Sequence, residues 1–275
     1  MPSSSALPTP QEWPHDGRKY VAALIFLAGL GVLSVLVGFG FVAIGRPDGL
    51  KYGLLFAVLF FLTAAYPYVT RVRPGHRIGD IRVTEHDGTP ATELRYSRAA
   101  FAILVGLMVC VIAILGLASV DFLLAGDEVP AGAVAVALAG AATLFCATFL
   151  LYVILGRLRR GTVVLSRTGI YQRGYAFSSF LPWSAIAGAK AAFNGTPEVL
   201  IIGYTNAPWE KRQHGGPWKL DKLPPVPMIE LVCTAFAVSP VLIYHFVKFY
   251  VENPAARDEL GTETSVQRAR HGELS

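Results

Sequence analysis

Four long apolar runs divide the chain, and shorter alternating patterns lie between and after them. The runs are Val21–Ile44, Tyr52–Thr70, Ala99–Val120 and Val129–Gly156. At a rise of about 1.5 Å per residue, helices of these lengths cross a hydrocarbon core about 30 Å thick. No charged residue lies in the central turns of any run. We therefore predict four transmembrane helices, two within residues 20–70 and two within residues 99–156.

Small residues recur at four-residue spacing within these runs, as at Ser34 and Gly38. Such spacing lets membrane helices approach closely. In a chain this rich in Ala and Gly it also arises by chance. A packing role for these residues is therefore one of two open explanations.

Short segments rich in Val, Ile and Tyr follow the fourth run and are typical of β-strands. The predicted strands are Thr162–Ser166, Ile170–Tyr175, Ser179–Trp183, Gly188–Phe193, Glu198–Tyr204 and Met228–Thr234. Asn194-Gly195 forms a tight-turn pair between two of them. Leu181-Pro182-Trp183 indicates a bend, because proline in a strand marks an edge or a bulge. We expect this bend to turn Trp183 into a core.

A single amphipathic helix is predicted over Val241–Glu252. Ser239 and Pro240 fit its N-cap and first position, and Asn253-Pro254 ends it. The 3–4 spacing gives it one core-facing stripe, made of Leu242, His245, Phe246, Phe249 and Asn253. Six strands closed by one helix predict a small, partly open β-barrel or sandwich over residues 157–261.

A β-hairpin is predicted over Ile81–Tyr96, within the segment 71–98 that joins the second and third runs. Apolar and polar residues alternate on both sides of an Asp87-Gly88 turn. An isolated hairpin is barely stable in water. We therefore expect this one to pack on the domain that follows the fourth run.

Both ends of the chain are polar. Residues 1–19 hold four prolines and three serines, and residues 262–275 lack apolar periodicity. Neither segment can bury enough apolar surface to offset the entropy of ordering. We expect two disordered tails.

Basic residues are distributed unequally between the two sides that four crossings create. One side receives only Arg46 and Lys51. The other receives Arg18, Lys19, Arg71, Arg73, Arg77, Arg82, Arg95, Arg98, Arg157, Arg159 and Arg160. Since Lys and Arg near span ends stay in the cytoplasm, we expect a multi-pass cell-membrane protein with both termini cytoplasmic.

Composition agrees with a membrane protein. Of the 275 residues, 53% are hydrophobic and 16% are charged, against about 45–50% and about 25% in soluble domains. The net charge of +5 resides chiefly beside the apolar runs, which favours topology over nucleic acid as its cause. Cys110, Cys146 and Cys233 lack zinc or redox spacing. Abundant Arg, Ala, Gly and Val suggest a GC-rich, actinobacterial-type genome.

Three segments carry a resemblance to a known family. They are Leu165-Ser166-Arg167-Thr168-Gly169-Ile170, then Leu181-Pro182-Trp183-Ser184-Ala185-Ile186, then the helix end from Glu252 to Gly261. Together they resemble bacterial membrane-anchored proteins with a pleckstrin-homology-like (PH-like) domain. The resemblance covers roughly residues 157–261 and implies a PH-like fold used for binding rather than catalysis.

A long loop, Thr205–Pro227, combines basic and aromatic residues. Basic side chains are attracted to anionic leaflets, and tryptophan prefers the membrane interface. Glu210 and Asp221 reduce the net charge, so an ordinary solvated loop is the competing explanation. The candidate membrane- or partner-contact residues are Trp209, Lys211, Arg212, Trp218, Lys219 and Lys222.

No pattern indicates a catalytic, metal or cofactor site. The six histidines lack a second ligand at metal-binding spacing, and no phosphate-binding loop, nucleophile elbow or paired acids occur. We expect neither an enzyme nor a bound cofactor.

Three functions remain, in order of preference. The first is an adaptor or scaffold whose cytosolic PH-like domain binds a partner protein or the membrane surface. The second is a small transporter or channel subunit, for which the runs offer only the hydroxyls of Thr63, Ser119, Thr143 and Thr148. The third is a lipid-modifying enzyme, whose sole cytosolic acidic cluster would be Asp80, Glu85, His86 and Asp87.

Overall fold

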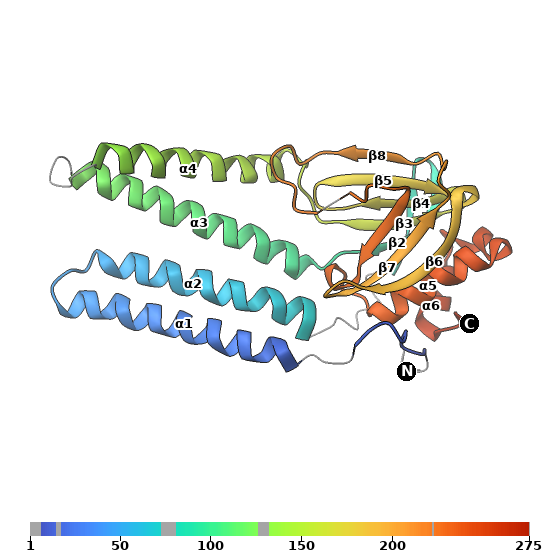
Figure 1. Cartoon of the computed structure of the whole chain (residues 1–275), viewed down its shortest axis with the longest axis horizontal. Helices are drawn as coiled ribbons and strands as arrows, with labels where there is room; N and C mark the ends of the chain where they lie inside the picture. The colour runs from blue at the N-terminus through green and yellow to red at the C-terminus, as the bar shows by residue number, and fades with distance from the viewer. Residues whose placement is uncertain (1–6, 15–17, 73–80, 126–131, 222, 275) are drawn as a thin grey trace. The chain divides into compact units, whose positions relative to one another are not determined.

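The computed structural model describes residues 7–14, 18–72, 81–125, 132–221 and 223–274. The chain forms two compact units, each assembled from segments far apart in sequence (Figure 1). The helical unit comprises residues 17–72 and 99–158. The β unit comprises residues 1–16, 73–98 and 159–275.

The helical unit contains the four predicted spans. They are α1 (Arg18–Ala43), α2 (Gly49–Pro67), α3 (Arg98–Ala125) and α4 (Gly132–Ile154). All four are long and apolar enough to cross a membrane, and a helix that is apolar all round has no polar face to present to water. After Pro67, α2 continues as a π-helical turn through Tyr68–Val72.

Small residues allow α1 and α2 to approach closely. A Cβ added at Gly53 would lie 2.5 Å from the Gly38 Cα and 2.8 Å from the Ser34 carbonyl oxygen. Both distances are shorter than real Cβ contacts, so only glycine fits there. Of the two explanations for Ser34 and Gly38, helix packing is therefore the one that the structure supports.

A six-stranded antiparallel sheet forms the larger part of the β unit. Its order is β1 (Ile81–His86), β2 (Thr89–Arg95), β3 (Thr162–Ser166), β4 (Gly169–Arg173), β5 (Phe177–Pro182) and β8 (Glu210–Gln213). The predicted hairpin forms β1 and β2, with Asp87 and Gly88 at positive φ in its turn. Because β2 pairs with β3, the expectation that the hairpin packs on the later domain is confirmed.

A second antiparallel sheet contains three strands, in the order β6 (Ile186–Phe193), β7 (Pro197–Gly203) and β9 (Met228–Val232). The two sheets meet through contacts such as Gln172 Nε2, which donates to the Glu230 carbonyl over 2.8 Å. No ladder joins the sheets into a closed barrel among the described strands. The structure therefore shows two antiparallel sheets followed by a C-terminal helix, without closure into a barrel.

Helix α5 (Pro240–Glu252) covers the core, as predicted, but with a different stripe. Leu242 and Phe246 are buried as expected. His245 and Phe249 are only half-buried and Asn253 is exposed. The buried positions beside them are Ile243, Val247 and Tyr250, so the buried stripe lies about one residue away from the predicted one.

Trp183 points into the core, as the Leu-Pro-Trp bend predicts. It lies in a 3-10 turn after β5 and is 7% exposed. Its indole N–H donates to the Ser166 carbonyl over 2.7 Å. The Arg257 guanidinium lies 4.4 Å from the ring centroid, a cation–π contact.

The described part of the C-terminal segment, residues 262–274, is ordered, against the prediction of a disordered tail. A 3-10 stretch, Pro254–Glu259, leads into α6 (Glu263–His271). Val266 and Ala269 are buried, and the Ser265 hydroxyl lies 2.7 Å from that of Thr92 in β2. The prediction failed because α6 is mostly polar and buries only a narrow stripe.

Within the N-terminal segment, the described residues 7–14 are also packed, against the prediction of disorder. Trp13 is 4% exposed, and its indole N–H donates to the Ala192 carbonyl of β6 over 2.8 Å. Its ring makes an edge contact with Tyr244 of α5. The large apolar surface of Trp13 is enough to hold this short polar segment on the β unit. The composition of the segment did not reveal this. The rest of the predicted N-terminal tail lies outside the described residues, except for Arg18 and Lys19, which begin α1.

Candidate functional site

The outer face of the six-stranded sheet carries a row of side chains that come from four strands. Tyr171 in β4 pairs with Val164 in β3 and with Phe180 in β5. Phe180 in turn pairs with Glu210 in β8. Because alternate residues of a strand share a face, these side chains project together, away from the buried Leu165, Ile170 and Leu181 of the inner face.

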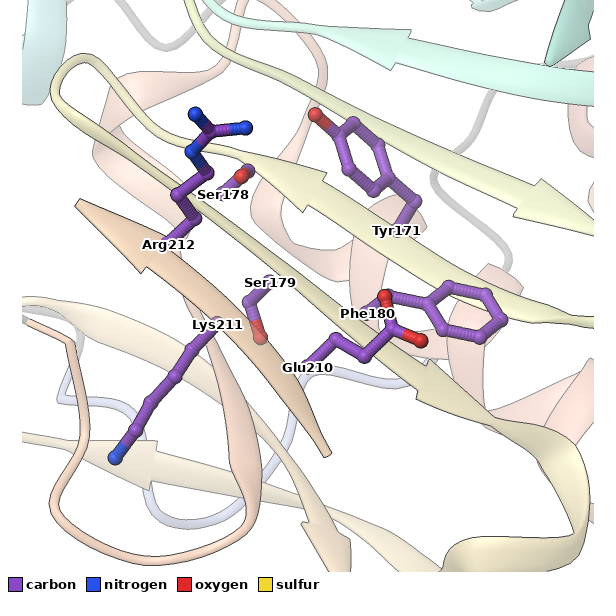
Figure 2. A pocket seen from close by; sticks show the side chains of 7 residues that line it. All are labelled: Tyr171, Ser178, Ser179, Phe180, Glu210, Lys211 and Arg212. Atoms are coloured by element: carbon purple, nitrogen blue, oxygen red, sulfur yellow. The ribbon is translucent and has the colours of Figure 1, made fainter. Parts of the chain in front are cut away.

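This row forms the floor of a groove, which we call the sheet groove. One part of it is a hollow of about 300 Å³. Figure 2 shows the side chains that line this part, namely Tyr171, Ser178, Ser179, Phe180, Glu210, Lys211 and Arg212. The adjoining part holds about 500 Å³ and is lined by His86, Asp87, Thr89, Thr168, Tyr171, Phe180 and Glu210. The two parts share Tyr171, Phe180 and Glu210, so they form one continuous groove.

One end of the sheet groove is aromatic and acidic. His86 stacks on Tyr171 with ring centroids 4.4 Å apart. The Asp87 carboxylate lies 3.6 Å from His86 Nε2 and is 93% exposed. Glu210 is exposed at the opposite side. Two accessible carboxylates beside an aromatic floor suit a ligand that offers cationic and apolar groups.

The other end of the sheet groove is basic. Arg173 in β4 pairs with Ser178 in β5, and Ser178 pairs with Arg212 in β8. The Ser178 hydroxyl lies 2.9 Å from His214 Nε2. Burial and the nearby charges of Arg173, Arg212 and Arg159 together lower the pKa of His214. His214 is therefore neutral at pH 7, in a strongly cationic environment.

Asp221 lies beside this basic end, but its oxygens are already used. They accept the backbone N–H groups of Tyr175, over 2.6 Å, and Ala176, over 3.1 Å. Burial raises the pKa of Asp221, while these hydrogen bonds and the Arg173 charge oppose that rise. Its structural role is to fix the turn between β4 and β5.

The residues predicted from the loop do not form a single surface. Lys211 and Arg212 occupy β8, a strand that the sequence did not reveal. Figure 2 shows Arg212 extending past Ser178 while Lys211 points the other way. The Lys211 Nζ atom lies 4.4 Å from the centroid of the Trp209 ring. The Trp209 indole N–H donates to the Ser179 hydroxyl over 2.6 Å.

Two further predicted residues lie in the connection between β8 and β9. Trp218 is half-buried and Lys219 is exposed. The Trp218 amide donates to the Gly215 carbonyl over 2.9 Å, which closes a turn. Lys222 lies outside the described residues. Of the five candidates that the structure describes, only Lys211 and Arg212 line the sheet groove.

Sequence reasoning missed the groove's own residues. The sequence pattern places Tyr171 and Phe180 in strands without assigning them to an open face, and it indicates His86 only as a member of the acidic cluster of the hairpin. The one signal available was alternation: Tyr171 and Phe180 fall between residues that are buried on the inner face. Which strands adjoin could not be read from that pattern.

The described residues contain no group of three His, Cys, Asp or Glu side chains that could hold a metal ion. Cys110, Cys146 and Cys233 are free thiols. In the acidic cluster weighed for a lipid enzyme, Asp80 lies outside the described residues, while His86 and Asp87 line the sheet groove.

The chain was compared with protein-family models, curated proteins and solved structures. No family model, no curated protein and no solved structure matches the chain.

Proposed function

We propose that this chain is a multi-pass membrane protein whose β unit acts as an adaptor, docking a partner protein in the sheet groove. The observation that carries this proposal is the aromatic and acidic end of the groove. Tyr171, Phe180 and His86 provide an open floor there, and Asp87 and Glu210 provide negative charge beside it. The complementary ligand is an extended protein segment that presents a basic residue next to an apolar one.

The arrangement of the sheets supports a PH-like binding module. Strands β3, β4 and β5 and strands β6, β7 and β9 form two antiparallel sheets followed by α5. These six strands and the helix correspond to those predicted from the sequence, in the segment that carries the resemblance to PH-like proteins. Two additions extend the larger sheet, namely the β1–β2 hairpin at β3 and the short strand β8 at β5. We assign the module to the PH-like class on this basis, with the additions building the groove.

The helical unit favours an anchor over a transport path. The four hydroxyls considered for a transporter all donate to backbone carbonyls: Thr63 to Leu59, Ser119 to Val136, Thr143 to Ala139 and Thr148 to Phe145. Asp121 binds Lys51 and Tyr52 at the ends of α3 and α2. A transport path needs polar groups that face a cavity.

The side of the membrane follows from the distribution of Lys and Arg. Eleven of these residues flank one side of the spans and two flank the other. By the positive-inside rule, we assign both termini and the β unit to the cytoplasmic side of the cell membrane.

Site-specific photocrosslinking in cells tests the docking proposal. A benzophenone amino acid replaces Phe180 in the full chain, and the control places it at Phe193, an exposed residue of β6 in the smaller sheet. We expect a discrete protein adduct from position 180 and none from position 193. Charge reversal by Glu210→Lys should abolish that adduct, whereas Lys190→Glu on β6 should leave it intact.

Two outcomes would contradict the proposal. One is an adduct whose yield does not change with Glu210→Lys, because charge complementarity would then play no part. The other is crosslinking at position 180 to phospholipid alone.

A further inference from the structure

The described N-terminal residues, 7–14, pack on the β unit as a separate short segment, which we call the N-terminal strap (Figure 1). Its sequence is Leu-Pro-Thr-Pro-Gln-Glu-Trp-Pro. Only Pro10 and Trp13, three residues apart, are buried, while Leu7 is half-buried and the other five residues are exposed. Two anchor residues therefore hold the strap on the protein surface.

The surface beneath the strap consists of Ala192 in β6 with Tyr244 and His245 in α5, and we call it the strap site. The Trp13 indole N–H donates to the Ala192 carbonyl over 2.8 Å, and its ring makes an edge contact with Tyr244 at a centroid distance of 6.0 Å. His245 Nε2 donates to the Pro8 carbonyl over 2.8 Å. The strap site thus holds one aromatic side chain and one main-chain carbonyl.

The strap is not a strand of either sheet. Among the described residues, no backbone hydrogen bond joins it to a strand or to α5. Its one backbone bond, from the Trp13 amide to the Pro10 carbonyl over 3.2 Å, closes a turn within the strap itself. The elements beneath it are held by other contacts, since β6 pairs with β7 from end to end and α5 buries its own apolar stripe. The strap can therefore leave without breaking the fold.

The composition of the strap is that of a peptide ligand. Its three prolines fix the backbone φ near −65°, so a segment of this kind loses little conformational entropy when it binds. Proline-rich segments are recognised by surfaces lined with aromatic side chains. Tryptophan is among the residues that contribute most to binding at protein interfaces. The strap combines both features on a surface that offers Tyr244 and two hydrogen-bonding groups.

We propose that the strap site binds a proline-rich segment of a partner protein with the pattern Pro-x-x-Trp, and that the chain's own strap occupies the site as a tethered competitor. The partner's tryptophan would take the place of Trp13 against Tyr244, with its indole N–H on the Ala192 carbonyl. No residue of the strap site lines the sheet groove. The site is therefore additional to the groove, and its occupation does not depend on the docking proposed there.

A fluorescent peptide with the sequence of residues 7–14 tests whether the strap site accepts a segment in trans. Fluorescence anisotropy measures its binding to the full-length protein in detergent, as the wild type and as Trp13→Ala. We expect saturable binding to Trp13→Ala and binding at least about tenfold weaker to the wild type, because a tethered segment competes at an effective concentration of about millimolar. A peptide with alanine in place of its tryptophan should bind neither protein.

Substitutions in the strap site locate the binding. In the Trp13→Ala protein, Tyr244→Ala should weaken the peptide at least about fivefold, because it removes the aromatic contact. Tyr204→Ala is the matched control, since Tyr204 is 58% exposed and lies just after β7, and it should leave the affinity unchanged. The ¹⁹F NMR signal of 5-fluorotryptophan at Trp183, a residue of the core, reports whether each variant is folded.

The same label follows displacement of the strap in the wild type. The Trp13 signal is assigned by Trp13→Phe. Unlabelled peptide at millimolar concentration should move this signal to the position of a solvent-exposed tryptophan. The Trp183 signal should stay in place, because the fold does not depend on the strap.

Three results would overturn the proposal. Equal affinity of the peptide for the wild type and for Trp13→Ala would place its binding elsewhere on the protein. Absence of binding to a Trp13→Ala protein whose Trp183 signal is unchanged would make the strap a fixed part of the fold. A wild-type dimer in light scattering that the peptide dissociates would mean that the strap of a second copy, rather than of the same chain, fills the site.

Discussion

At the scale of single residues, Gly38 and Gly53 bring the backbones of α1 and α2 close together. A Cβ at Gly53 would overlap the backbone of Gly38 and Ser34, whereas a Cβ at Gly29 of the same hairpin meets nothing within 4 Å. Gly53 and Gly29 therefore look alike in sequence but differ in what an added methyl group would contact. Gly53 lies at the contact between α1 and α2, whereas Gly29 lies in an open position.

Replacing Gly53 with Ala should separate α1 from α2. Overpacking of this kind costs about 1–3 kcal/mol, so we expect a lower thermal midpoint for the detergent-solubilised protein. The matched control, Gly29→Ala, should keep the midpoint or raise it slightly, because alanine favours a helix. Equal midpoints for the two variants would show that the contact between the glycines does not support the hairpin.

A second residue-scale prediction concerns the carboxylate of Glu259. It accepts two bonds from Arg268, over 2.6 and 3.0 Å, and one from the Tyr250 hydroxyl over 2.7 Å. Burial by itself would raise the pKa of Glu259, but these hydrogen bonds and the Arg268 charge outweigh it, so the pKa lies below its usual value. The ionised carboxylate therefore stabilises the folded state.

The pH dependence follows from that direction. The stabilisation is fully present above the unfolded-state pKa of about 4.3 and is lost as pH falls through the lower folded-state pKa. Glu259→Gln should therefore cost about 1–3 kcal/mol at pH 7, and the difference from wild type should shrink below about pH 4. Thermal unfolding across this range measures it. Glu263→Gln, at a largely exposed carboxylate, is the control, and a pH-independent difference would contradict the prediction.

At the scale of elements, local signals were sufficient wherever an element carries its own pattern. The Asp87-Gly88 turn, the Thr162–Ser166 strand and the Pro240 helix start were all predictable because residues nearby in sequence specify them. Strand β8 was not, since all four of its residues are polar and exposed. β8 forms because it pairs with the edge strand β5, a contact between segments far apart in the sequence. The sheet groove was unpredictable for the same reason, because its floor is made by strands whose neighbours the sequence does not state.

Helix α6 provides a test of such tertiary support. The connection before it turns at Gly261, whose φ is +82°, and a Cβ there would overlap the backbone of Pro90 and Ala91. Its amide donates to the Thr92 hydroxyl over 3.0 Å. We expect Gly261→Ala to release α6 from the sheet, with faster hydrogen exchange in residues 263–271.

Gly195 provides the matched control for that substitution. It also has a positive φ, +74°, but an added Cβ would meet nothing within 4 Å. Gly195→Ala therefore carries the backbone strain without the overlap. If both variants leave exchange in α6 unchanged, the contact between Gly261 and β2 does not hold the helix in place.

At the scale of the whole molecule, the β unit is interrupted by two spans. Strand β2 precedes α3 and strand β3 follows α4, yet Arg95 and Thr162 are direct partners. Ala91 and Leu94 of β2 are fully buried. A domain limited to residues 157–261, as the sequence predicts, would therefore expose one side of β3 and would also lack α6.

The pairing of β2 with β3 allows a direct test of whether the hairpin is part of the fold. Because Arg95 and Thr162 lie opposite each other, a four-residue Gly-Ser loop can replace the two spans between Ser97 and Arg160. We expect the resulting protein, residues 81–97 joined to 160–275, to be soluble and to give a dispersed amide NMR spectrum. The fragment 157–261 should aggregate, because its unpaired β3 edge and buried apolar residues would be exposed. Leu94→Asp in the joined protein should abolish folding, and a well-folded 157–261 fragment would show that the hairpin is an accessory rather than a part of the fold.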